Sequence, residues 1–175
     1  MGYHQYSNIS GSSILLNGWN RLNGLKACKL FILRSLEMCD LTNDIFEPVA
    51  KRISERVSSL SEIRRLCNNC GIEGWLKVEA VYALSGMVRS VNNRGPDLTL
   101  TNGTKIELKG MTNFDAVSIQ NGCANYGVPC LFLADGSNQE RVNEIENEEV
   151  RVIASRIIRE ESGNWIVGLA KPIGK

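Results

Sequence analysis

Two short segments of alternating polar and apolar residues, joined through Asn102-Gly103, constrain the fold more than any other feature of the chain. Residues 97–101 read Asp-Leu-Thr-Leu-Thr and residues 104–109 read Thr-Lys-Ile-Glu-Leu-Lys. Alternation with a period of two is typical of strands that bury one face. The pair therefore predicts a β-hairpin whose leucines and Ile106 face the core.

The length of the connecting loop decides which residues lie opposite each other. A two-residue turn would place Asp97 and Glu107 on opposite faces of the sheet. A three-residue loop, with Gly103 in the left-handed conformation, makes Asp97 and Glu107 direct cross-strand neighbours. The same register pairs Leu98 with Ile106 and keeps the apolar residues together. We predict this register, which sets the two carboxylates on Cβ atoms about 5 Å apart.

Carboxylates this close repel each other unless a cation lies between them. Lys109 lies two residues beyond Glu107 on the same face of the strand. Oxygen ligands suit a hard cation such as Mg²⁺, which keeps several waters and takes one or two protein carboxylates. The hairpin therefore predicts a Mg²⁺ site, with Mn²⁺ as the alternative ion.

A third carboxylate comes from a helix predicted over residues 71–85. One stripe of this helix, at ~100° per residue, holds Ile72, Trp75, Leu76, Glu79 and Ala83. A carboxylate that faces a core is costly unless it is paired, bound to a metal or protonated. We therefore expect Glu79 to reach the site of Asp97 and Glu107. Glu73 lies off the stripe, and we expect it to be solvated.

With Glu79 on a helix, Pro96-Asp97 on one strand and Glu107-Leu108-Lys109 on the next, residues 71–135 resemble the PD-(D/E)XK nuclease superfamily. The resemblance implies a restriction-endonuclease-like α/β core, with a mixed central sheet flanked by helices. In such a core a helix leads into three antiparallel strands, a second helix and a strand parallel to part of the sheet. The chain offers strands near 87–92, 97–101 and 104–109, a helix near 114–124 and a strand over 128–134.

The resemblance also implies a chemistry, the hydrolysis of DNA by a metal-activated water, as in a type II restriction enzyme. Asp97, Glu107 and the backbone carbonyl of Leu108 would bind the ion, which lowers the pKa of a bound water. Lys109 would orient that water or help to deprotonate it. Glu79 would hold a second metal or a metal-bound water.

DNA contacts are expected to be local, because the net charge of the chain is only +1. Arg94 and Lys105 flank the motif, and Gln120 of the second helix matches a glutamine found in some relatives. Other candidates for phosphate contacts are Lys26, Lys29, Arg34, Arg64, Arg65 and Arg89. The expected partners are DNA and a second copy of the chain in a homodimer. No apolar run is long enough to span a membrane.

Other interpretations use the same residues. The chain is also compatible with a junction-resolving or repair nuclease, or with a non-catalytic nucleic-acid-binding protein that keeps the fold. In the simplest alternative, Glu107 and Lys109 form the solvated side of an edge hairpin, and Asp97 opens a turn. Glu79 then makes an ordinary ion pair.

The sequence lacks the residues that several other kinds of catalytic or binding site require. His4 is the only histidine, which removes Ser-His-Asp and histidine-rich metal sites. No GxxxxGK[ST] loop occurs. The Cys67-Asn-Asn-Cys70 pair has no second pair to complete a zinc site, so zinc is not predicted. The polar residues 1–13 show no secretion signal, so we expect an intracellular, cytoplasmic protein with reduced cysteines.

We expect a single domain over residues 1–175, in three parts. Residues 1–70 are expected to form a mostly helical N-terminal extension. Residues 71–135 are the nuclease-like core, and residues 136–175 a helix plus a C-terminal hairpin. The ranges expected for this last part are a helix over 138–149 and strands over 150–159 and 165–170, joined across Ser162-Gly163-Asn164.

The N-terminal extension contains the clearest amphipathic pattern of the chain. Apolar residues recur every three or four positions from Ile45, at Val49, Ile53, Val57, Leu60 and Ile63. The spacing predicts one helix that is capped near Asn43 or Asp44, or that becomes regular at Pro48. We expect its apolar stripe to pack against the sheet rather than to form a dimer interface. A further helical stretch is predicted over residues 24–38.

Overall fold

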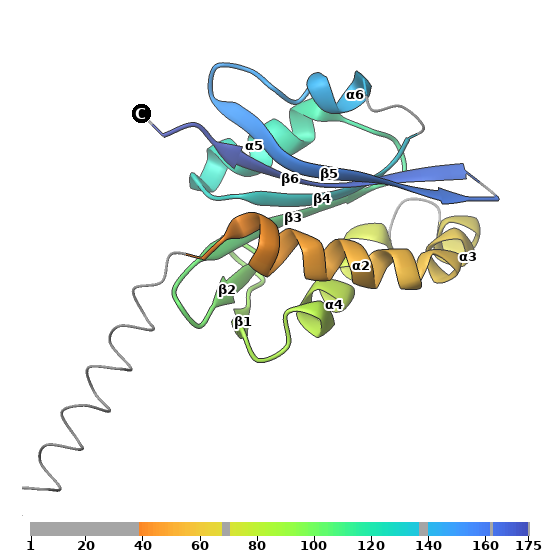
Figure 1. Cartoon of the computed structure of the whole chain (residues 1–175), viewed down its shortest axis with the longest axis horizontal. Helices are drawn as coiled ribbons and strands as arrows, with labels where there is room; N and C mark the ends of the chain where they lie inside the picture. Colours follow the sequence, from red (N-terminus) through yellow and green to blue (C-terminus); the bar gives the residue numbers. More distant parts are fainter. Residues whose placement is uncertain (1–38, 68–70, 137–139, 162, 175) are drawn as a thin grey trace, which may run out of the picture. The chain divides into compact units, whose positions relative to one another are not determined.

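A computed structural model of the protein describes residues 39–67, 71–136, 140–161 and 163–174. The helix expected over residues 24–38, together with His4 and Cys70, lies outside the described residues. Cys39–Lys175 forms one compact unit. Within it, six strands make one mixed, mostly antiparallel sheet in the order β1-β2-β3-β4-β6-β5. Helices cover both faces of the sheet, which confirms the α/β class (Figure 1).

The elements follow each other along the chain as expected from the sequence, with slightly different ends. The strands are β1 (Val88–Val91), β2 (Leu98–Leu100), β3 (Lys105–Met111), β4 (Cys130–Asp135), β5 (Val150–Glu160) and β6 (Gly163–Pro172). The helices are a π-helical segment η1 (Leu41–Phe46), α2 (Glu47–Glu55), α3 (Val57–Cys67), α4 (Ile72–Ala83), α5 (Ala116–Tyr126) and α6 (Glu140–Asn143). Helices α2, α3 and α4 lie on one face of the sheet, and α5 and α6 lie on the other (Figure 1).

The β2–β3 hairpin has the register that its apolar pattern predicts. Leu98 lies opposite Ile106 in the antiparallel ladder. The N–H of Leu100 donates to the carbonyl of Thr104 at 2.8 Å, and Gly103 closes the three-residue loop with φ of 88°. A positive φ of this kind is easy for glycine and strained for other residues. The bulged loop is therefore confirmed, and the leucines and Ile106 lie in the core.

Strand β3 has neighbours of two different orientations. It pairs antiparallel with β2 on one side and parallel with β4 on the other. A parallel neighbour requires a crossover connection, which α5 supplies. Asp115 caps that helix by accepting the N–H of Ser118, and Gly127 ends it in the left-handed conformation. The expected second helix and parallel strand are confirmed.

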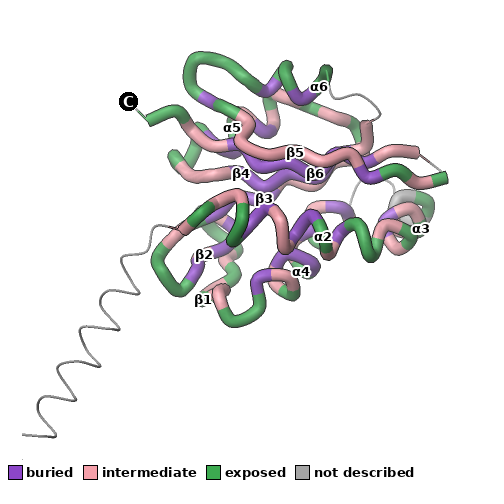
Figure 2. The backbone as a smooth tube through the Cα atoms, viewed as in Figure 1, coloured by how far each residue is buried: buried purple, intermediate pink, exposed green. Residues whose placement is uncertain are grey.

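The backbone tube of the central strands is coloured mostly as buried, and the exposed residues lie mainly in loops and on the outer sides of helices (Figure 2). The larger core cluster joins α2, α3 and α4 to the sheet and includes Val49, Ile53 and Leu60. The amphipathic stripe therefore packs in the core, as predicted. The smaller cluster lies under α5 and contains Ile119, with Phe132 from β4.

The amphipathic segment is interrupted, in contrast to the single helix that its spacing predicts. It begins as the π-helical segment, whose N-cap is Asp40 rather than Asn43 or Asp44. Asp40 accepts the N–H groups of Thr42 and Asn43, as capping aspartates do. The regular helix α2 begins at Glu47, with Pro48 in its first turn, where a missing N–H is tolerated. A break at Arg56, with φ of −120°, separates α2 from α3.

The C-terminal part also differs from its sequence pattern. The helix expected over 138–149 is limited to the four residues of α6 in the described structure. The expected hairpin forms, but its strands are longer and Glu160 lies opposite Gly163. Gly163 and Asn164 therefore belong to β6 rather than to the turn. The β5–β6 pairing thus includes Gly163 and Asn164, although glycine and asparagine are depleted in strands.

Helix α4 packs against β3 most closely at Gly110. Gly110 faces the first turn of α4, and a Cβ atom at this position would overlap the backbone of Ile72 and Glu73. Backbone atoms cannot move aside as the end of a flexible side chain can. The absence of a side chain at Gly110 therefore sets the distance between α4 and the sheet.

We predict that Gly110→Ala destabilises the protein by about 2 kcal/mol or more, because overpacking against a backbone forces the helix and strand apart. Chemical denaturation of the two proteins measures the difference. Gly74→Ala is the matched control, because it lies within α4 and a Cβ atom there meets nothing within 4 Å. Replacing a helical glycine should add up to ~1 kcal/mol. A Gly110→Ala protein as stable as the wild type would contradict the close contact.

Candidate active site at the open edge of strand β3

Asp97 immediately precedes β2 and is buried, with an exposed fraction of 8%. Its Oδ2 accepts the backbone N–H of Leu108 at 2.9 Å. Its Oδ1 forms an ion pair with the ammonium of Lys77, which comes from α4. The ladder between the two strands ends at Leu98 and Ile106, and the next residue on each side is Asp97 and Glu107. The structure therefore holds this aspartate against the strand that carries the other motif residues.

The carbonyl of Leu108 faces the same open edge. The N–H of Glu107 donates toward β4, to the carbonyl of Pro129 at 2.9 Å. Neighbouring residues of a strand alternate the side to which their N–H and C=O groups point. The polar backbone groups of Leu108 therefore point to the β2 side, past the first residue of β2. An oxygen ligand is available there beside the carboxylate of Asp97.

Glu107 is buried at 6% exposure on the face of β3 that α5 covers. Its Oε1 lies 2.9 Å from the ammonium of Lys109. Its Oε2 is buried, and no described residue forms a hydrogen bond with it. Because a buried carboxylate oxygen without a partner is costly, such an atom indicates a site that can bind a cation or a hydrogen-bond donor. Among the described residues, Oε2 of Glu107 is the clearest indication of such a site.

Helix α5 can lie close to this carboxylate because Gly122 has no side chain. A Cβ atom there would lie 3.4 Å from both Glu107 Cγ and Lys109 Cε, and 3.1 Å from Cys130 Sγ. Beneath the helix, Cys123 and Cys130 are buried and hydrogen-bonded to each other. The hydrogen bond with Cys123, burial and the nearby charge of Glu107 raise the pKa of the Cys130 thiol. The Cys130 thiol near Glu107 therefore keeps its proton at neutral pH.

Lys109 is half-buried and lies between two carboxylates. Its ammonium is 2.9 Å from Glu107 Oε1 and 4.0 Å from Glu73 Oε2. Burial alone would lower the pKa of Lys109, but the hydrogen bond and the charges of Glu107 and Glu73 outweigh burial and raise it. The group therefore keeps its proton at neutral pH. A protonated lysine can orient water or balance charge.

The helix glutamate nearest to the motif lysine is Glu73 rather than Glu79. Glu79 is buried, as its position on the apolar stripe predicts. Its carboxylate pairs with Arg52 at 2.6 Å and lies 3.9 Å from Arg56, both from the preceding helical segment. Among the described residues, nothing links Glu79 to Asp97 or Glu107. This is the ion pair of the simplest alternative interpretation, and Glu79 lies apart from the candidate site.

Sequence reasoning missed Glu73 and Lys77, because neither lies on the apolar stripe of α4. Both come to the site because Gly110 lets the first turn of α4 approach β3. A signal was present in the sequence, since a glycine directly after the motif lysine allows a helix to pack there. The four-residue spacing of Glu73 and Lys77 also places the two charges on the same side of the helix.

The three residues expected to contact DNA lie in different settings. Arg94, in the loop between β1 and β2, and Lys105, at the start of β3, are both exposed. They remain candidates for phosphate contacts. The amide of Gln120 donates to the backbone carbonyls of Glu144 and Ile145, at 3.2 and 3.0 Å. Gln120 therefore ties α5 to the segment after α6, and the structure gives its side chain a supporting role.

The oxygen ligands at this edge are of the kind that a hard cation such as Mg²⁺ prefers. It contains the carboxylates of Asp97 and Glu107 and the carbonyl of Leu108, and one oxygen of Glu107 lacks a partner. Within the described residues, no three His, Cys, Asp or Glu side chains gather closely enough to form a ligand cluster. Water and a backbone carbonyl would therefore have to complete the shell, which is common for Mg²⁺.

Comparisons with protein-family models, with curated proteins and with solved structures find no match for this chain. None of the described helices is both long and apolar enough to cross a membrane. The assignment of a function therefore depends on the site itself.

We predict that Arg52→Ala destabilises the protein by about 2–4 kcal/mol, because it leaves a buried carboxylate with only a distant arginine. Arg52 also stacks over Tyr82, with 5.4 Å between the guanidinium carbon and the ring centroid. Arg65→Ala is the control, since its ion pair with Glu62 is exposed and such surface pairs contribute little to stability. Thermal or urea unfolding of the variants measures both. Equal effects would show that the Glu79 pair is not buried.

Proposed function

We propose that the protein is a metal-dependent endonuclease that hydrolyses phosphodiester bonds in DNA. The observation that carries this proposal is the buried Oε2 of Glu107, which has no hydrogen-bond partner among the described residues. Glu107 lies on β3 next to Leu108, whose N–H donates to the carboxylate of Asp97 just before β2. Two carboxylates and a carbonyl can hold the ion that metal-assisted phosphate hydrolysis uses, and a protonated lysine can orient water beside it.

The order and direction of the elements support a restriction-endonuclease-like core. Helix α4 leads into the antiparallel strands β1, β2 and β3, and α5 then leads to β4, which is parallel to β3. Asp97 precedes the second of these strands, and the Glu107-Leu108-Lys109 tripeptide lies in the third. This placement of Asp97 and the tripeptide supports the proposal, whereas Glu79 departs from the motif because it pairs with Arg52.

In the proposed mechanism, Asp97, Glu107 and the Leu108 carbonyl would hold Mg²⁺ or Mn²⁺. The bound ion would acidify a water molecule and stabilise the charge that develops on the phosphate. Lys109 keeps its proton and donates a hydrogen bond that orients the attacking water. Glu73 lies near the Lys109 ammonium and limits its movement. Glu79 has no role in this chemistry and stabilises the helices that support it.

The proposed partners are double-stranded DNA and a second copy of the chain. One site of this kind cuts one strand, so a double-strand break requires two sites with opposite orientation. A twofold homodimer supplies them. Exposed Arg94 and Lys105 would contact phosphates beside the site, and such contacts make binding sensitive to salt. Sedimentation or gel filtration tests the dimer.

We predict that the wild-type protein cleaves plasmid DNA with Mg²⁺ and that EDTA stops cleavage. Asp97→Ala and Glu107→Ala should each lose roughly 100-fold or more, because changes even to residues that support metal ligands cost 10–100-fold. Glu62→Ala is the control, since Glu62 lies in an exposed ion pair on α3. Equal activity of the wild type and both site variants would end the catalytic assignment.

The type of DNA that is cut distinguishes a restriction-type enzyme from a junction-resolving enzyme and from a non-catalytic DNA-binding protein. Supercoiled, linear, single-stranded and branched DNA are offered in parallel under the same conditions. Discrete fragments from linear duplex favour a restriction-type enzyme, whereas cutting confined to the branch favours a junction-resolving enzyme. Binding to DNA without cleavage under any of these conditions favours the non-catalytic alternative.

We predict that Lys109→Arg is nearly as damaging as Lys109→Ala, with a loss of about 100-fold for each. The ammonium of Lys109 fits between Glu107 and Glu73, while a planar guanidinium has a different shape and set of donors. Single-turnover cleavage measures the loss, and denaturation confirms that both variants fold. An arginine variant with wild-type rates would show that only the positive charge matters.

A further inference from the structure

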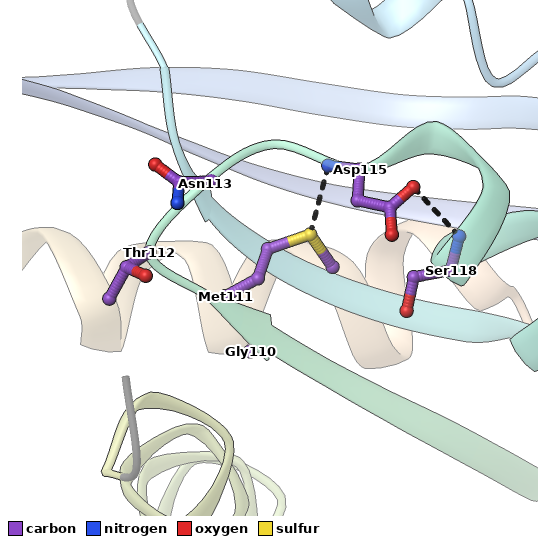
Figure 3. Close-up of a pocket in the computed structure, with 6 residues that line it drawn as sticks. All are labelled: Gly110, Met111, Thr112, Asn113, Asp115 and Ser118. Atoms are coloured by element: carbon purple, nitrogen blue, oxygen red, sulfur yellow. Dashed lines mark hydrogen bonds between the residues drawn. The ribbon is translucent and has the colours of Figure 1, made fainter. Parts of the chain in front are cut away.

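A cavity of about 320 Å³ lies immediately beyond the candidate active site (Figure 3). It opens between the C-terminal end of β3 and the start of α5. Its first lining residue, Gly110, directly follows Lys109 in the chain. The other lining residues are Met111, Thr112, Asn113, Asp115 and Ser118. The cavity therefore adjoins the strand position of Lys109 in the chain.

The lining suits a nucleobase better than a phosphate. No lysine or arginine of the described structure lines the cavity. The start of α5 would otherwise attract an anion, but the Asp115 carboxylate already accepts the N–H of Ser118 at 3.2 Å and adds negative charge. What remains is an amide, hydroxyl groups and a carboxylate. These are the groups that read the donor and acceptor pattern of base edges.

The cavity is held in shape before any ligand binds. The N–H of Asp115 donates to the sulfur of Met111 at 3.3 Å, which fixes the loop and places a polarizable thioether in the wall (Figure 3). Only Oδ1 of Asp115 is engaged by Ser118, and no described residue bonds Oδ2. Its second oxygen can therefore accept an N–H from a ligand. The volume lies at the low end for small-molecule sites and suits one base.

We propose that this cavity reads the nucleobase beside the cleaved phosphate and favours a base that carries an amino group on its major-groove edge. Asp115 accepts a hydrogen bond from that amino group, and Asn113 and Ser118 contact the neighbouring ring atoms. Cytosine and adenine present such donors in the major groove, whereas thymine presents an acceptor and a methyl group. The proposal rests on the nuclease function above and adds its sequence preference.

The main test is cleavage of a duplex library with a randomised segment, followed by sequencing of the cut ends. The wild type should enrich cytosine or adenine at one position within two nucleotides of the cut. Asp115→Asn keeps a good helix cap and should reduce that preference by about tenfold, with the total cleavage rate within twofold. Glu148→Gln, an exposed charge elsewhere, is the control. The same preference in Asp115→Asn and the wild type would overturn the proposal.

A second measurement tests the cavity independently of cleavage. If the wild type does not cleave DNA, that result contradicts the nuclease proposal alone. The methyl group of Met111 lies in the cavity wall and can be followed by NMR after ¹³C-methyl methionine labelling, with Met111→Leu for assignment. Cytidine or adenosine should shift this signal more than thymidine or inorganic phosphate, and less so in Asp115→Asn. No shift with any nucleoside, or an equal shift with phosphate, would overturn the cavity assignment.

Discussion

The close contact between Gly110 and the first turn of α4 is the constraint on which the candidate site depends. It fixes the helix against β3 without an intervening side chain. Glu73 and Lys77 then extend toward Lys109 and Asp97, which lie on neighbouring strands. A wider spacing would leave both helix charges in solvent. The geometry of the site is thus a consequence of backbone packing more than of any single ion pair.

Charge balance explains why so many ionisable groups are tolerated near a core. Asp97 and Glu107 are buried, and each has its own ammonium, Lys77 and Lys109 respectively. Buried charges are stable only when paired or hydrogen-bonded. The pairing is incomplete at one oxygen of Glu107. That single deficit distinguishes this cluster from the Glu79 pair, in which both carboxylate oxygens face arginines.

Local patterns in the sequence predicted the hairpin and its register well, because only one register keeps Leu98 and Ile106 on the core side. They also predicted that Glu79 lies in the core. They did not predict its partner, because the pairing with Arg52 depends on how two helices pack. Glu73 was missed for the same reason. The break at Arg56 is a tertiary effect too, since the periodicity continues across it. The spacing of residues along the chain thus predicts which face of a helix or strand is buried. The contacts between different elements can be known only from the three-dimensional structure.

All the charged groups of the candidate site lie between residues 73 and 109, on one helix and the hairpin that follows it. The C-terminal strands β5 and β6 complete the sheet but supply none of them. Contacts that are close in sequence form quickly, because little chain entropy is lost in closing short loops. The acidic cluster can therefore assemble early during folding, before the sheet is closed. Residues after 109 contribute to this cluster by burial instead of by charge, since α5 approaches Glu107 closely at Gly122.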